Sequence, residues 1–115
     1  MAYVDGFVLA VKKDRLEDYK KMAAKGRDVW MANGATSYVE AIADDVPYGD
    51  LTSFPRAVMA QDDEVVVFSY ITYPDKETRD ACMKVVMETM EMDPSEMPFD
   101  GKRMIFGGFK PFIQA

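Results

Sequence analysis

The chain has 115 residues, 49% of them hydrophobic and 30% charged, which suits one globular domain with a substantial core. Its formal net charge of −6 argues against nucleic-acid binding, because a phosphate backbone needs a basic face. The absence of histidine excludes Ser-His-Asp and Cys-His nucleophiles, His-ligated haem and the usual His-containing zinc sites. Any general acid or base must therefore be Asp, Glu, Tyr, Lys or the single cysteine, Cys82.

The sequence also indicates where the protein works. It opens on a strand-like pattern, with no basic leader and no apolar run long enough to cross a bilayer, so we expect no membrane partner. Cys82 cannot form an internal disulfide, which suits the reducing cytoplasm, and we expect it to be buried and inert. We expect no cofactor and no metal, because the ten methionines are scattered and the acids lack the spacing of a calcium loop.

The first predicted element is a strand at residues 3–11, which are rich in β-branched and aromatic side chains. A helix follows, with apolar side chains at three- and four-residue steps. We place its N-cap at Asp14, three residues before a glutamate, and its end at Asn33-Gly34. Residues 35–43 then alternate as a second strand, in which Tyr38 and Glu40 share a face.

Residues 44–63 form a connection longer than usual, so we expect it either to be functional or to contain a short element. Two prolines and a glycine, among them Pro55, oppose a helix here, and residues 51–60 fit an extended piece. This segment is therefore predicted as a lid or dimer clamp, or as a surface loop held by its prolines.

The second half of the chain repeats the strand and helix pattern. Residues 64–73 are the clearest strand, with three consecutive valines, and a helix follows from Asp75 to about Met92. The last strand is predicted at 102–109. Its pair Gly107-Gly108 precedes no helix, so we interpret it as a bulge or a close backbone approach rather than an anion-binding loop.

The order β-α-β-β-α-β predicts an α+β domain of the ferredoxin-like type over residues 1–115, with a four-stranded antiparallel sheet and both helices on one face. The strands carry more apolar residues than one face can use. Soluble monomers rarely expose a large apolar patch, so we predict a two-fold homodimer that packs the second face against another copy.

Four stretches resemble one family: YVDGFVLAV at 3–11, ADDVPYGDLTSFPRAV at 43–58, DEVVVFSYITY at 63–73 and MPFDGKRMIFGGFKP at 97–111. They resemble the YbaA-like bacterial proteins, a domain-of-unknown-function family in the dimeric α+β barrel superfamily. The resemblance implies a ferredoxin-like monomer whose sheets pair as a barrel, and no established activity. The chain departs from the family pattern at Asn33, where members often carry a histidine.

Six side chains are candidates for ligand binding. Trp30, Tyr38, Phe68 and Tyr70 would line a cavity between sheet and helices that accepts a flat organic molecule; the alternative is that they form core or dimer interface. Arg56 would bind an anion or an acid of a partner chain from the central loop, and Arg103 would do so from the start of the last strand. Another group, Glu40, Asp44 and Asp45, is interpreted as solvated acids rather than as a base or cation site.

Two functions stay open, and no catalytic residue is assigned. The first is a dimeric module that binds a small metabolite or a partner protein, with a cavity that is filled or wholly apolar. The second, implied by the superfamily, is a cofactor-independent monooxygenase or isomerase acting on a small organic substrate, aromatic or not. It requires an enclosed pocket with a titratable group of shifted pKa. The lack of histidine favours the first.

Overall fold

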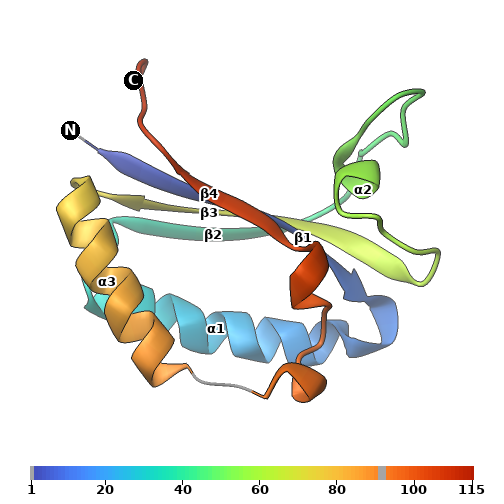
Figure 1. Ribbon diagram of the computed structural model, residues 1–115, viewed down its shortest axis with the longest axis horizontal. Helices are drawn as coiled ribbons and strands as arrows, with labels where there is room; N and C mark the ends of the chain where they lie inside the picture. Colours follow the sequence, from blue (N-terminus) through green and yellow to red (C-terminus); the bar gives the residue numbers. More distant parts are fainter. Residues whose placement is uncertain (1, 91–92) are drawn as a thin grey trace.

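The computed structural model describes residues 2–90 and 93–115 and has the predicted order of elements (Figure 1). Four antiparallel strands form one sheet in the order β2-β3-β1-β4, so β2 and β4 are its edges. The strands are β1 (Tyr3–Lys12), β2 (Ser37–Ile42), β3 (Glu64–Tyr73) and β4 (Ile105–Phe109). The ferredoxin-like α+β prediction is confirmed.

Two long helices, α1 (Leu16–Ala32) and α3 (Lys76–Thr89), cover one face of the sheet. Asp75 caps α3, because its side chain accepts a hydrogen bond from the Thr78 amide at 2.7 Å. The helix ends at Thr89; its predicted end at Met92 lies outside the described residues. Within 2–90 and 93–115, no helix combines the length and the apolar character that a bilayer crossing needs.

The predicted N-cap of α1 is wrong. The chain leaves β1 through a 3₁₀ turn at Lys13–Arg15, so the α-helix starts only at Leu16 and Asp14 falls inside the turn. Arg15 takes the cap position without a capping side-chain bond. Its guanidinium instead binds Asp18 and the carbonyls of Glu96 and Met97, which ties the start of α1 to the segment before β4.

Residues 44–63, which we call the arm, contain a short helix, α2 (Phe54–Ala57), where an extended piece was predicted. Pro55 lies in the first turn of α2, where a missing amide hydrogen costs no helical bond. Ser53 accepts a bond from the Arg56 amide at 3.2 Å and caps the turn. A proline and a serine therefore start this helix, although the proline was expected to prevent one.

The two faces of the sheet have different surroundings. Tyr3, Leu9, Ile71 and Tyr73 point toward α1 and α3 and belong to the main core. On the other side, which we call the open face, only the end near the arm is covered, where Val58 packs on a few apolar strand residues. The remaining open face exposes Phe68, Tyr70, Ile105 and Phe109.

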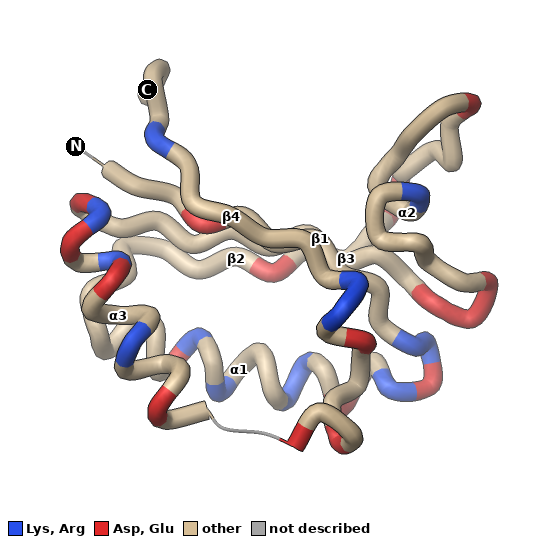
Figure 2. Tube along the Cα trace, in the orientation of Figure 1, with Lys and Arg blue, Asp and Glu red and all other residues tan. Residues whose placement is uncertain are grey.

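The charged residues are unevenly distributed over the elements. Figure 2 shows most charged residues on the helices, the arm and the turns, whereas the strands carry few. The arm rises on the open side of the sheet at one end, and residues 110–115 rise on the same side at the other end (Figure 1). The open face is thus an apolar floor between two raised borders.

Gly107 and Gly108 lie inside β4, opposite Gly6 and Asp5 of β1, as the strand interpretation requires. A Cβ atom at Gly108 would lie 2.6 Å from Arg79 Nη2 and would also overlap the Tyr3 ring. The glycine therefore permits the arginine and the tyrosine to lie against the strand backbone.

Candidate functional site

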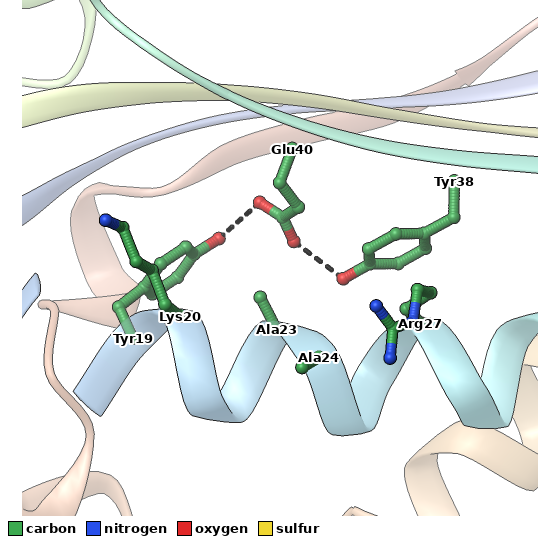
Figure 3. A pocket seen from close by; sticks show the side chains of 7 residues that line it. All are labelled: Tyr19, Lys20, Ala23, Ala24, Arg27, Tyr38 and Glu40. Atoms are coloured by element: carbon green, nitrogen blue, oxygen red, sulfur yellow. Dashed lines mark hydrogen bonds between the residues drawn. The ribbon is translucent and has the colours of Figure 1, made fainter. Parts of the chain in front are cut away.

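An open pocket lies between α1 and the edge strand β2 (Figure 3). Its volume is about 280 Å³. The floor is a carboxylate between two tyrosines, and the rim on α1 carries two cations. The lining residues are Tyr19, Lys20, Ala23, Ala24, Arg27, Tyr38 and Glu40.

Local periodicity brings these groups together. On α1, Tyr19 and Ala23 lie on the stripe that faces the sheet, and the next residue of each turn, as at Lys20 and Ala24, faces the β2 edge. On β2, Tyr38 and Glu40 are two residues apart and project from the same face. The edge position of β2 leaves one side of this contact open to solvent.

Glu40 is the centre of the pocket. Tyr19 donates its hydroxyl hydrogen to Glu40 Oε1 at 2.7 Å, and Tyr38 donates to Oε2 at 2.6 Å. Burial, reinforced by the Glu40 carboxylate, raises the pKa of both phenols well above their ordinary value of about 10. Both tyrosines therefore act as hydrogen-bond donors at neutral pH and not as bases.

A glycine allows this geometry. Gly26 is buried in the middle of α1, and a Cβ atom there would lie 3.2 Å from the Tyr38 hydroxyl and 3.1 Å from the Trp30 ring. The glycine costs α1 some helix propensity but lets the phenol approach the helix closely. The Trp30 and Tyr38 rings pack with centroids 5.5 Å apart. Trp30 thus forms the wall behind Tyr38.

The rim of the pocket is positively charged. Lys20 Nζ lies 3.4 Å from Glu17, and Arg27 Nε lies 3.1 Å from Asp28, and all four side chains are exposed. Such exposed pairs contribute little and exchange readily. Both cations are therefore free to contact an anionic group that enters above the Glu40 carboxylate.

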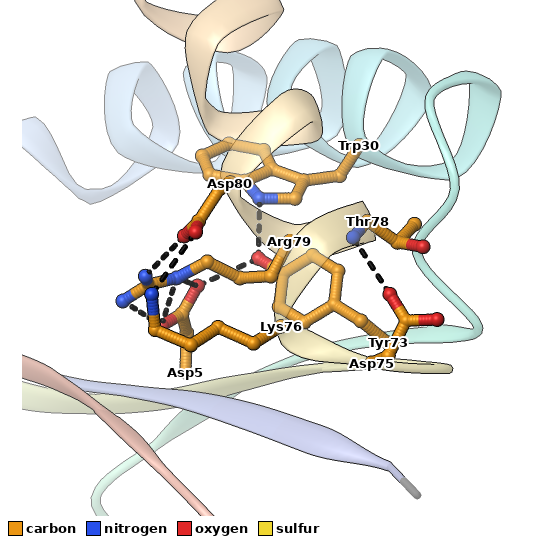
Figure 4. A network of polar contacts seen from close by, with 8 residues as sticks. All are labelled: Asp5, Trp30, Tyr73, Asp75, Lys76, Thr78, Arg79 and Asp80. Carbon is orange, nitrogen blue, oxygen red and sulfur yellow. Dashed lines mark hydrogen bonds and ion pairs between the residues drawn. The ribbon is translucent and has the colours of Figure 1, made fainter.

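A second polar network lies under the other end of the sheet (Figure 4). Asp5 is held by Arg79 at 3.0 Å and accepts the Tyr73 hydroxyl at 2.7 Å. Trp30 Nε1 donates to that same hydroxyl at 3.1 Å. The hydrogen bond to Asp5 raises the pKa of Arg79, and burial raises that of Tyr73. Every polar group here has a partner, so this network is structural.

A third network joins the arm to the segment before β4. Arg103 makes a two-pronged contact with Glu64 at 2.7 and 2.8 Å, and it also binds Asp100 and the Met59 carbonyl. The Glu64 side chain is only 1% exposed, and its bond to Arg103 lowers its pKa. The guanidinium of Arg103 is thereby held by groups of its own chain.

The predicted site residues are divided between places. Tyr38 lines the pocket and Trp30 backs it, but Phe68 and Tyr70 lie on the open face, 41% and 36% exposed, so the four do not form one cavity. Even-numbered residues of β3 point away from the helices, which is the physical reason. Arg56 binds the carbonyls of Tyr48 and Gly49 and so holds the arm together.

Sequence reasoning missed Tyr19, and its interpretation of Glu40 as a solvated acid is wrong, because Glu40 is half-buried and accepts hydrogen bonds from two phenols. Alternation on β2 did place Glu40 on the same face as Tyr38. The contact with Tyr19 joins residues 21 positions apart across the helix and strand layers, so no local pattern signals it. Asp44 and Asp45 are exposed, as the solvated interpretation predicted. Cys82 is buried, and burial raises the pKa of its thiol.

Comparison with known proteins bears out the resemblance and the fold. The family model described as "Protein of unknown function (DUF1428)" matches residues 2–101. The chain is 50% identical to the uncharacterized protein YbaA of Escherichia coli strain K12, and the match covers 98% of each chain. The YbaA protein of Shigella flexneri matches equally well.

Two solved structures share the fold at low sequence identity. A dimeric ferredoxin-like protein from an uncultured marine organism matches with a TM-score of 0.59 at 9% identity over 100% of both chains. Rv0793 from Mycobacterium tuberculosis matches with a TM-score of 0.54 at 12% identity, covering 100% of this chain and 99% of that one. From the family match and the 50% identity together, the chain belongs to the DUF1428 family of proteins of unknown function.

Proposed function

We propose that the protein is a cytoplasmic homodimer that binds a small organic acid in the pocket between α1 and β2. The observation that carries the ligand is the Tyr19–Glu40–Tyr38 floor beneath a rim of Lys20 and Arg27. A half-buried polar cluster at the bottom of an open pocket is a common form of binding site.

The ligand class follows from the groups that remain available. Each Glu40 oxygen accepts one phenol and retains a lone pair for a ligand hydroxyl or amine. Ala23, Ala24 and the two tyrosine rings offer apolar contact for a short carbon skeleton. Lys20 and Arg27 favour a carboxylate at the entrance. The best match is a hydroxy acid, an amino acid or a phenolic acid.

A thermal-shift screen tests this proposal with a panel of such acids and their amides. We expect acids to raise the melting temperature of the wild-type protein and the uncharged amides to raise it less. The variant Glu40→Gln should abolish the shift, and Arg27→Gln should weaken it. Glu88→Gln, on the exposed side of α3, is the matched control and should behave as wild type. Equal shifts in Glu40→Gln and wild type would contradict the assignment.

The homodimer part of the proposal rests on the open face of the sheet. Four exposed apolar side chains on one face of the sheet are costly to leave in water, and a second copy of the same face would cover them. The similarity to a dimeric ferredoxin-like protein favours this mode. Sedimentation of Phe68→Asp should show a monomer where wild type is a dimer, whereas Met87→Asp on α3 should stay dimeric. A wild-type protein that sediments as a monomer at micromolar concentration would contradict the proposed homodimer.

Proton transfer is the second candidate, and the position of the Glu40 carboxylate between two phenol hydroxyls favours it. A ligand that displaced one tyrosine from Glu40 would meet a carboxylate base beside a protonated phenol, a pair that can move a proton next to a carbonyl. Exchange of substrate hydrogen for deuterium in heavy water would reveal it. The reaction should vanish in Glu40→Gln and slow in Tyr38→Phe. Binding without exchange would leave the protein a binding module.

A further inference from the structure

A second hollow lies on the open face, beside the arm, and is separate from the Glu40 pocket. Its volume is about 240 Å³ and its lining is almost entirely apolar. The walls come from the end of β2, the start of β3 and α2 of the arm. The lining side chains include Ala41, Ile42, Val46, Phe54, Val66 and Phe68. We call this hollow the arm groove.

The 110–115 segment carries apolar side chains with nothing to pack on. Phe112 is 92% exposed and Ile113 is 81% exposed, the former more than any other large hydrophobic residue of the described chain. The segment leaves β4 on the same side of the sheet as the arm groove but at the opposite end (Figure 1). Within one chain, the segment and the groove are therefore far apart along the strands.

In a two-fold homodimer, the 110–115 segment of one copy can lie near the arm groove of the other. An axis parallel to the strands would leave both arms at one end of a face-to-face pair, where they would collide. An axis across the strands sends the arms to opposite ends, so each 110–115 segment rises beside the partner's arm. Phe112 and Ile113 lie three and four residues beyond the end of β4, so an extended segment carries them about 10 and 13 Å, and neighbouring strands are about 4.8 Å apart. The segment can thus cross from β4 to the groove at β2 and β3 of the other copy.

The charges agree with this pairing. Asp44 and Asp45 flank the arm groove and are exposed, and Asp44 is part of its lining. Lys110 precedes the two apolar residues of the segment and is also exposed. None of these three side chains makes an ion pair among the residues that the structure covers. An acidic border beside the groove and a lysine beside the apolar pair are complementary.

We propose that Phe112 and Ile113 of one copy occupy the arm groove of a second copy, with Lys110 facing Asp44 and Asp45. This contact rests on the proposed homodimer and assigns the arm its task, which is to receive the partner's 110–115 segment. The exposed aromatic group and the apolar groove would each be removed from water by the other.

A cross-linking experiment on the full chain tests the contact. Val46→Cys and Phe112→Cys are prepared separately, mixed and oxidised mildly; Cys82 is buried and serves as an inert background. We expect a disulfide-linked heterodimer that contains one chain of each variant. Mixing Phe112→Cys with Met87→Cys, whose thiol lies on α3, is the control and should give no such product.

A second measurement distinguishes this contact from the dimer itself. The double variant Phe112→Ser, Ile113→Ser should raise the dimer dissociation constant by at least about tenfold without altering the monomer fold. Met31→Ser, an exposed apolar residue at the end of α1, should leave it unchanged. A wild-type monomer would overturn the dimer and this contact together. A stable dimer with no heterodimer cross-link would overturn this contact alone.

Discussion

The two faces of the sheet are built from alternating residues of the same strands but differ in the kind of contact that they make. On the helix face, two carboxylates have specific polar partners: Asp5 contacts Arg79 and Tyr73, and Glu40 accepts hydrogen bonds from two phenols. The open face instead exposes apolar side chains, and its charged residues lie at its borders. Directional hydrogen bonds fix one arrangement of a single chain, whereas an exposed apolar surface favours association with another chain.

The largest expected effect comes from breaking the Asp5 network on the helix face. Arg79→Ala leaves the Asp5 carboxylate, whose side chain is 5% exposed, without its cation. We expect a loss of about 3–5 kcal/mol in unfolding free energy, because an uncompensated buried charge is costly. Lys76→Ala on the same helix removes only an exposed pair with Asp80 and should cost less than about 0.5 kcal/mol. Urea denaturation of both variants measures the difference.

Adding one methyl group to β4 tests the close approach on the same face. Gly108→Ala places a Cβ atom against the ends of the Arg79 and Tyr3 side chains, and we expect it to cost about 2 kcal/mol, the middle of the range for overpacking. Gly101→Ala is the matched control, since no atom lies within 4 Å of its added Cβ, and should change stability by less than about 0.5 kcal/mol. Equal thermal stability of the two variants would contradict the packing argument.

Two tyrosines of β3 give the most direct comparison of the faces. Tyr73→Phe removes a donor to Asp5 and leaves Trp30 Nε1 without an acceptor, so we expect a loss of about 2 kcal/mol. Tyr70 lies on the open face, and its hydroxyl makes no hydrogen bond within the described parts of the chain. Tyr70→Phe should therefore stay within about 0.5 kcal/mol of wild type. Chemical denaturation that ranks Tyr70→Phe as the weaker variant would reverse the assignment.

The smallest effect is a pH dependence in alkaline solution. The pKa values of Tyr19, Tyr38 and Tyr73 are raised in the folded protein, so above pH 10 the folded state holds protons that the unfolded state has lost. Their contribution to stability is present in full below pH 10 and falls as the pH rises further. Phenolate absorbance should show these tyrosines titrating only on unfolding. The slope of stability against pH should be shallower in Tyr38→Phe.

The fold was predictable because local signals agreed with it. Alternation marked β2, valine and aromatic content marked β3, and Asn33-Gly34 ended α1 where the structure ends it. The resemblance to a known family agreed with the same order of elements. The short helix α2 was missed, because Pro55 was judged by its effect inside a helix although it occupies the first turn, where it is favourable.

The candidate site was predicted only in part, because the two faces of β3 have similar side chains. Both faces of β3 are apolar, since one packs on helices and the other is left bare, so alternation could not show on which side Phe68 and Tyr70 lie. Tyr38 was found from its residue type. Tyr19 was not, because its role depends on a helix-to-strand contact that arises only when α1 docks across β2.

The strand order has a consequence for how the chain is made. β1 is synthesised first, yet its two neighbours in the sheet are β3 and β4, which emerge far later. A nascent chain must hold β1 with both edges unpaired until most of the polypeptide has appeared, and pairing across such sequence distances is slow. Newly made chains are therefore most prone to aggregation before β3 emerges. Chaperone depletion should reduce the yield of this protein more than that of a helical protein of equal length.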